Sequence, residues 1–262
     1  MSFINKLRTI LPFSNRFQLL ADAILFRQTR LSVHRFGEIE AIIDRRAADA
    51  GSIRTCLGTS MYRDFLSYID RKTESMIVLD IGANVGGFSL LLKSQGYKLK
   101  KLICVELNPR TFIRLQFNIA YNFYPSTEYH LVNTAITGDG REVHVNLGIG
   151  STGDSIYKES DSDPIGISIN GITLNSLFDQ FVPKDQPVDI CKIDIEGAEN
   201  EVFSSAMSSA ISRCRYLIME IHHAELYDSL AKDIARHGFV LLSQELSSNR
   251  CGVHLFKNTS FN

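Results

Sequence analysis

From residue 76 onward, apolar stretches of strand length alternate with stretches that have helical spacing. Runs of consecutive apolar residues are typical of strands buried on both faces of a parallel sheet. Five such runs occur: MIVLDIG (76–82), LKKLICVEL (99–107), YHLVNTAI (129–136), VDICKIDI (188–195) and YLIMEI (216–221). Helix-like segments such as FSLLLKSQG and AENEVFSSAM lie between them. This alternation predicts an α/β fold with a doubly wound, mostly parallel sheet.

The two ends of the chain follow different patterns. FVLLSQEL and CGVHLFK are joined by the turn-like SSNR, which predicts an antiparallel hairpin at the sheet edge. Before residue 76, apolar residues recur at helical spacing on both sides of Pro12, which predicts two short amphipathic helices. GEIEAIID (37–44) then alternates like a strand, and a helical stretch follows. We therefore expect an N-terminal helical extension with one strand (1–75) and a domain that holds the sheet (76–262).

One segment, after the third predicted strand, does not fit the alternation. Residues 137–176 contain two strand-like stretches, EVHVNLG and ISINGITL, separated by a long polar loop. An insertion of this size in a compact domain is typical of a lid or binding loop, although loops are also polar for solvation alone. Its candidates for contact with a substrate carry hydroxyl groups: Ser151, Thr152 and Tyr157.

Composition and charge narrow the class of protein. The 262 residues include 28 Lys plus Arg and 29 Asp plus Glu, for a net charge of −1. This balance argues against binding by blanket neutralisation of phosphates, so no nucleic-acid partner is expected. The five cysteines form no CxxC pair, and the N-terminus lacks the pattern of a secretory signal. We therefore expect a cytoplasmic protein with buried thiols.

The first 35 residues are basic, with six Lys or Arg side chains against a single acid, Asp22. A basic amphipathic helix can lie on an anionic membrane surface, which leaves peripheral contact with the inner face of a membrane open. The alternative is a helix that packs on the domain and leaves its basic face in solvent. The same helices could form a homodimer contact.

The sharpest motif is VLDIGANVGGFS (78–89), in which a buried strand runs through a glycine-rich turn into a helix. Gly82 and Gly86 allow a tight bend and a close approach to a ligand, beside the free N–H groups of a helix N-terminus. Asn84 stands where the dinucleotide fingerprint GxGxxG needs its second glycine, and no GK[ST] follows for a P-loop. Asp80 would place a carboxylate beside the ligand, which suits a cationic group better than a phosphate.

A second acidic residue, Glu106, lies at the end of the next predicted strand. A carboxylate at this point can accept hydrogen bonds from both hydroxyls of a ribose. Together with Asp80 and the glycine turn, it suits an adenosine that carries no phosphates, as in S-adenosylmethionine. The alternative for Glu106 is an ordinary surface acid.

VLDIGANVGGFS followed by CVELNP resembles the nucleoside half of class I S-adenosylmethionine-dependent methyltransferases, and KIDIEGAENEVF is similar to the signature of the FkbM-type family. The resemblance covers about residues 76–245 and implies a seven-stranded sheet with a reversed last strand. It also implies methyl transfer to a hydroxyl, mostly of sugars and natural products. The residues that it places at the methionine end are Asp80, Gly82, Asn84 and Gly86. It places Glu106 at the ribose, Asn108 near the adenosine, and Asn133 and Thr134 near the adenine, and counts Phe88 and Asp194 among the cofactor-binding residues.

Candidate catalytic residues follow the fourth and fifth predicted strands. Asp194 and Glu196 would share a side if the strand continues, and could face the methionine amino group or take the proton of an acceptor hydroxyl. His222 could be the general base as a neutral imidazole, oriented by Glu220, which would also lie near the substrate. The alternatives are an acid that only caps the next helix and a loop histidine bonded to backbone.

The same residues could hold a metal ion. Asp194, Glu220 and His222 offer oxygen and nitrogen ligands, but their spacing is not diagnostic, so Mg²⁺ is conceivable and not expected. The prediction is an S-adenosylmethionine-dependent O-methyltransferase whose acceptor is a sugar, glycolipid or secondary metabolite. An NAD(P)-dependent oxidoreductase on the same type of sheet and a non-catalytic binding domain are the alternatives.

Overall fold

A seven-stranded sheet forms the centre of the computed structural model, which describes residues 8–25, 30–47, 49–69, 75–145, 156 and 166–261. The strand order is β12-β13-β11-β10-β3-β4-β5, and all strands run parallel except β13, which is antiparallel to both neighbours. The strands are β3 (Met76–Ile81), β4 (Leu99–Glu106), β5 (Glu128–Asn133), β10 (Val188–Ile193), β11 (Cys214–Ile221), β12 (Phe239–Leu246) and β13 (Gly252–Asn258). The predicted fold class and the predicted C-terminal hairpin are therefore confirmed.

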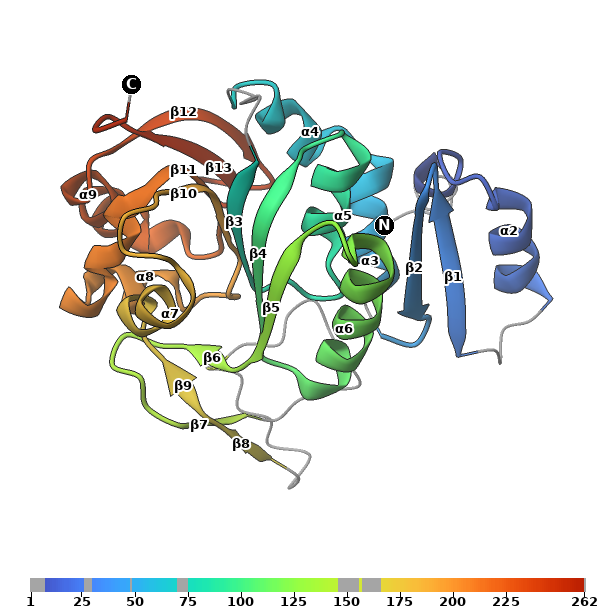
Figure 1. The fold of residues 1–262 in the computed structure, drawn as a ribbon, viewed down its shortest axis with the longest axis horizontal. Coiled ribbons are helices and arrows are strands. Elements are labelled where there is room, and N and C mark those ends of the chain that lie inside the picture. Colours follow the sequence, from blue (N-terminus) through green and yellow to red (C-terminus); the bar gives the residue numbers. More distant parts are fainter. Residues whose placement is uncertain are drawn as a thin grey trace.

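Helices cover both faces of the sheet (Figure 1). One face carries α3 (Asp49–Gly58), α4 (Met61–Leu66), α5 (Gly87–Ser94) and α6 (Pro109–Phe123). The other carries α7 (Leu174–Phe181), α8 (Glu199–Ser204) and α9 (Tyr227–Arg236), with a 3₁₀ helix at Ala206–Arg213. Because side chains alternate along a strand, Val78 belongs to the first core and Leu79 to the second. In β3, β10 and β11 nearly all side chains are buried on both faces, which explains the continuous apolar runs of these strands.

The N-terminal part has two strands, not the one strand predicted. After residues 8–10 and α2 (Arg16–Ile24), which are helical, β1 (Leu31–Phe36) and β2 (Ile39–Asp44) form an antiparallel hairpin. In β1 the buried positions are Ser32 and His34, so polar side chains face inward and the strand has no apolar alternation to reveal it. Phe13 packs edge-on against His34, with ring centroids 5.1 Å apart.

The buried side chains of this N-terminal part form one core with those of α5, α6 and the sheet, among them Phe13, Ile53 and Leu91. The hairpin stands beside α3 and α6 in Figure 1. No helix in the described part of the chain has the length and apolar character needed to cross a membrane.

The insertion leaves the main sheet earlier than predicted. The third predicted strand divides into β5 and β6 (Ala135–Ile136), and β6 pairs in parallel with β9 (Gly171–Ile172). β7 (Val143–Val145) pairs with β8 (Ile167–Ile169), so both strand-like stretches of the insertion are strands. The end of the predicted insertion is helical, because Thr173 Oγ1 accepts a hydrogen bond from Ser176 N and caps α7.

Three predicted substrate residues, Ser151, Thr152 and Tyr157, lie outside the described residues. The contact that we predicted between the polar loop and a substrate therefore stays a prediction.

Candidate functional site

A cavity of about 500 Å³ opens at the carboxyl ends of β3, β4, β10 and β11. The strand order reverses at β3. The next strand of the sheet along the chain, β4, lies on one side of β3, and β10 lies on the other side. Open α/β sheets bind ligands at such switch points. Nine predicted site residues line the cavity: Gly82, Asn84, Phe88, Thr134, Glu106, Asp194, Glu196, Glu220 and His222.

The glycine turn after β3 is held by the neighbouring strands. Gly82 N and Ala83 N both donate to the carbonyl of Val105, at 3.0 and 2.9 Å. Gly82 has φ +71°, and a Cβ there would lie 1.7 Å from the carbonyl oxygen of Asp194. Glycine is therefore required for contact between two backbone segments of the protein, in addition to the ligand approach predicted from the sequence.

Glu106 is fixed between the turn and the end of its own strand. Its Oε2 accepts a hydrogen bond from Asn84 N, and its Oε1 accepts one from Asn108 N, each at 2.8 Å. Asn84 reaches this position with φ +51°, a conformation that Asn adopts more readily than most residues. A carboxylate has about four acceptor sites, so hydrogen bonds to ribose hydroxyls can be added to these two.

Asp80 and Gly86 were predicted to line the methionine end, but neither belongs to the cavity lining. Asp80 is fully buried, and its Oδ2 accepts a hydrogen bond from Ser89 Oγ at 2.6 Å. Gly86, with φ +91°, precedes α5 and packs against the side chains of Leu115 and Ile119 on α6. Both predictions are corrected: these residues support the turn from behind.

Asn108 and Asn133 also lie outside the lining. Asn108 is buried and caps α6, because its Oδ1 accepts hydrogen bonds from Arg110 N and Thr111 N. Asn133 Nδ2 donates to the carbonyls of Glu106 and Leu107 and so joins β5 to the end of β4. Both side chains are thus occupied within the protein, and their predicted places near the adenosine and the adenine stay predictions, whereas Thr134 does face the cavity.

Four carboxylates surround the imidazole of His222. Its Nδ1 lies 2.9 Å from Glu199 Oε1, and Nε2 lies 3.4 Å from Glu196 Oε2 and 3.8 Å from Asp194 Oδ1. Glu220 Oε1 is more distant, at 4.0 Å from Nε2. We call Asp194, Glu196, Glu199, Glu220 and His222 the acidic cluster.

The carboxylate that orients His222 is Glu199, not the predicted Glu220. The Glu199 side chain is only 3% exposed and lies in the first turn of α8, so it turns back toward the end of β10. Glu196 also reaches the cluster in an unpredicted way. Strand β10 ends at Ile193, and Glu196 turns inward with φ +53°, so strand alternation does not place it.

The charges of the cluster shift its pKa values. Burial alone would lower the pKa of His222, but the hydrogen bond and charge of Glu199 raise it to about 9. Burial, followed by the charge of Asp194, raises the pKa of Glu196 to about 7. The imidazole is therefore cationic at neutral pH, which corrects the prediction of a neutral general base. Glu196 is the group poised to take a proton near neutrality.

Lys192, which was not predicted as a site residue, contacts Asp194 of the acidic cluster through its Nζ. Nζ donates to the carbonyl of Gly82 at 2.7 Å and to Asp194 Oδ2 at 3.1 Å, and lies 3.8 Å from Asp80 Oδ1. Burial alone would lower the pKa of Lys192, but the carboxylates of Asp194 and Asp80 raise it above the usual value. The sequence does contain a signal for Lys192: it is a charged residue within a buried strand, and such a residue needs a partner of opposite charge.

A wall of the cavity comes from the N-terminal part of the chain. Ser52 and Thr55 of α3 and Tyr62 of α4 line it. The Tyr62 ring packs edge-on against Phe88, with centroids 5.6 Å apart, and the residue is 4% exposed. Helix α3 approaches α5 closely because Gly87 has no side chain: a Cβ there would lie 3.0 Å from Ser52 Oγ. Sequence reasoning missed this wall.

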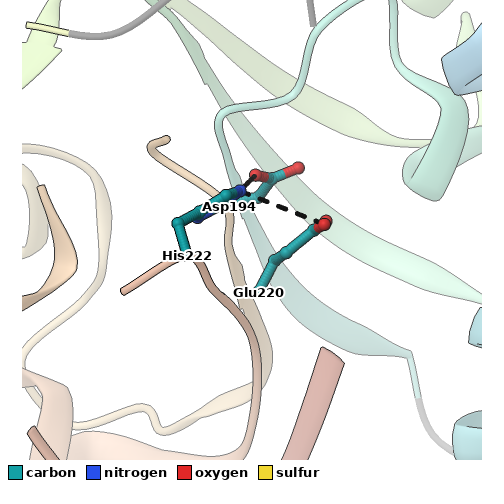
Figure 2. Close-up of side chains that lie close together, drawn as sticks. All are labelled: Asp194, Glu220 and His222. Atoms are coloured by element: carbon teal, nitrogen blue, oxygen red, sulfur yellow. Dashed lines mark ion pairs between the residues drawn. The ribbon is translucent and has the colours of Figure 1, made fainter. Parts of the chain in front are cut away.

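Asp194, Glu220 and His222 point toward one another (Figure 2), and their ligand atoms lie within 4.8 Å of one another. This donor set fits a divalent ion, since Glu199 holds Nδ1 of His222 and leaves Nε2 toward the other two residues. However, Lys192 already donates a hydrogen bond to Asp194. The cluster is thus neutralised in part by the protein itself.

Residues 80–242 match the model of the FkbM methyltransferase domain. No curated protein matches the chain. Among solved structures, similar chains include a methyltransferase FkbM from Methylobacillus flagellatus KT, with 18% identity over 76% of this chain and 47% of that one and a TM-score of 0.49. Another is the M. jannaschii tRNA m1G37 methyltransferase, with 14% identity, 87% and 55% coverage and a TM-score of 0.45. A third is M. capricolum TrmK in complex with S-adenosyl-homocysteine, with 10% identity, 75% and 67% coverage and a TM-score of 0.41.

These matches bear on two points. The chain spans about half the length of the M. flagellatus protein. The expectation of no nucleic-acid partner is withdrawn, since the similar solved structures include a tRNA methyltransferase. Net charge sums over a whole chain and says nothing about one face, so a charge of −1 does not exclude RNA.

Proposed function

This chain belongs to the FkbM methyltransferase family, and from that premise we propose that it is an S-adenosylmethionine-dependent O-methyltransferase. Its acceptor is a small hydroxylated molecule, a sugar or a natural product. The observation that carries the proposal is that one cavity, at the switch point of the sheet, is lined both by Glu106 and by four residues of the acidic cluster: Asp194, Glu196, Glu220 and His222.

Two parts of the cavity lining suit two parts of the cofactor. Glu106, held by Asn84 N and Asn108 N, is placed to accept hydrogen bonds from ribose hydroxyls. Asn84 stands where a dinucleotide site needs a glycine for the approach of the pyrophosphate, and Lys192 of the cavity lining hydrogen-bonds to Asp194. The acidic cluster favours the cationic methionine end by Coulomb attraction. This distribution supports S-adenosylmethionine over a dinucleotide.

S-adenosylmethionine would supply an activated methyl group to an acceptor oxygen. The protein then has two tasks, to hold the acceptor hydroxyl in line and to remove its proton. Glu196 serves as proton acceptor, because its pKa of about 7 matches neutral conditions. His222 and Glu199 keep a fixed cation beside this carboxylate. The acceptor oxygen would lose its proton to Glu196 as it gains the methyl group, so that the methyl ether and S-adenosylhomocysteine would be the products.

We place this activity in the cytoplasm. Four of the five cysteines are buried, and none forms a disulfide in the described chain, which supports a reducing compartment.

Calorimetric titration of the purified protein with S-adenosylmethionine, S-adenosylhomocysteine and NAD tests the cofactor. We expect heat with the first two and none with NAD; the reverse would overturn the proposal. Transfer of labelled methyl to nucleotide sugars, glycolipids, natural-product alcohols and tRNA then tests the acceptor, with a chelator added in parallel. Transfer to a small alcohol that persists in chelator is expected, and transfer to tRNA alone would replace the small acceptor by RNA.

A further inference from the structure

Lys192 occupies a special place between two strand ends. Its strand β10 is the neighbour of β3 in the sheet, and Lys192 is the register partner of Asp80. The side chain is 6% exposed. A lysine ammonium carries three donors, and here they face the carbonyl of Gly82, the Oδ2 of Asp194 and, at 3.8 Å, the Oδ1 of Asp80. One buried cation therefore ties the glycine turn to the segment that follows β10.

The contact leaves the two oxygens of Asp194 in different situations. Oδ2 accepts the hydrogen bond from Lys192 at 3.1 Å. Oδ1 is buried, accepts no hydrogen bond from any residue that the structure describes, and lies 3.8 Å from His222 Nε2. Because Oδ2 is anchored, the direction of Oδ1 is fixed, and Asp194 belongs to the cavity lining.

Asp80 and Ser89 complete the buried contacts around Lys192. Ser89 Oγ donates to Asp80 Oδ2, and Asp80 has no exposed surface. Asp80 therefore balances the charge of Lys192 without competing for the cavity. A buried ammonium without such partners would be costly, which explains why an acid stands at the end of β3.

We propose that Lys192 is a positioning residue for the cofactor, and that it aims Asp194 at the cationic methionine end by anchoring both Asp194 and the carbonyl of Gly82. This inference rests on the proposed function. It differs from a simple charge effect, because a positive charge near a cationic ligand would by itself weaken binding.

The opposite signs of the two effects define the experiment. Lys192→Met removes the anchor and keeps much of the side-chain volume. If Lys192 positions Asp194, S-adenosylmethionine binds about tenfold to hundredfold more weakly, the range for losing a hydrogen bond to a charged group. If Lys192 acts only as a charge, the affinity for this cation is unchanged or higher, which would overturn the inference.

A second ligand separates positioning from general damage. 5′-Methylthioadenosine keeps the adenosine but lacks the amino-acid end and the positive charge. Calorimetry of Lys192→Met should show nearly unchanged affinity for this compound and weakened affinity for S-adenosylmethionine. Equal weakening of both ligands would indicate that Lys192 only maintains the fold of the cavity, and would overturn the inference.

A double variant separates the loss of positioning from a general loss of stability. Lys192→Met leaves Asp80 buried without its counter-ion, so Asp80→Asn/Lys192→Met removes both charges, and the asparagine can still accept the hydrogen bond from Ser89. We expect the double variant to recover thermal stability. Its affinity for S-adenosylmethionine should still be lower than that of Asp80→Asn alone, with no matching loss of affinity for 5′-methylthioadenosine. Recovery of both the thermal stability and the affinity for S-adenosylmethionine would contradict the inference. If the wild type binds neither ligand, the proposed function itself fails and takes the inference with it.

Discussion

The backbone of Gly82 lies directly against the backbone of Asp194, so that a Cβ at position 82 would stand 1.7 Å from the Asp194 carbonyl oxygen. Asp194 N in turn donates to the carbonyl of Ile81 at 3.0 Å. The glycine turn and the acidic segment after β10 are thus a single packed unit, although 112 positions separate them in the sequence.

The contact predicts that Gly82→Ala displaces Asp194. We expect a loss of about 2–5 kcal/mol in the free energy of unfolding, because the cost of a left-handed backbone and the cost of the overlap with Asp194 add up. Affinity for S-adenosylmethionine should fall as well. Gly96→Ala is the control, since Gly96 has φ +77° and no atom near its Cβ position. Urea denaturation of the two variants measures the difference, and equal losses would show that the contact with Asp194 is unimportant.

Glu199→Gln should lower the pKa of His222. The glutamine can still accept the hydrogen bond from Nδ1 but removes the negative charge 2.9 Å away. Loss of a charge at this distance typically moves a pKa by about 1–3 pH units. NMR titration of the imidazole measures the change. Glu225→Gln, next to the exposed His223, should leave His222 as it is. An unchanged His222 pKa in Glu199→Gln would assign the shift to other groups.

The acidic cluster should make the protein less stable as the pH rises. The pKa of His222 is raised from 6.5 to about 9 on folding, so its contribution is complete below about pH 6.5 and lost as the pH passes 9. This contribution is up to about 3 kcal/mol. Glu196 acts in the same direction from about pH 4.5 to 7, because its pKa is also raised.

Urea denaturation at pH 6 and pH 9.5, in the wild type and in His222→Gln, isolates the histidine. We expect the difference in stability between the two pH values to be smaller in the variant. A difference of the same size in both proteins would show that other groups cause the pH dependence.

The cavity wall formed by α3 depends on a buried ion pair. Arg114 of α6 contacts both carboxylate oxygens of Asp49 at the start of α3, and their side chains are 10% and 1% exposed. Arg114→Met should cost about 3–5 kcal/mol, since it leaves a buried carboxylate unpaired.

The exposed pair Arg35–Glu40, in which the arginine side chain is 46% exposed, is the control for this prediction. Arg35→Met should cost at most about 1 kcal/mol. Chemical denaturation compares the two variants, and a similar small loss in both would mean that the buried pair adds little.

The sequence was sufficient for the sheet and for part of the site. Continuous apolar runs predicted the strands that are buried on both faces, and β1 escaped because Ser32 and His34 are its inward positions. Glu106 and Asp194 stand at strand ends, so topology alone brings them to one cavity.

Side-chain pairing across strands could not be predicted. Asp80 was assigned to the ligand because its partner Lys192 comes from a strand 112 residues later, and no pattern along the chain reveals that register. The same holds for Glu199, whose direction depends on how α8 meets the end of β11. Charged residues in buried segments are visible in a sequence, but their partners are set by the order of the strands.

The wall built by Ser52, Thr55 and Tyr62 stands outside the stretch that matches the family model. One wall of the cavity and its acidic residues therefore come from separate segments of the chain. Substitutions in α3 and α4 can therefore change this wall without altering Glu106 and Asp194, which line the same cavity from within the family match.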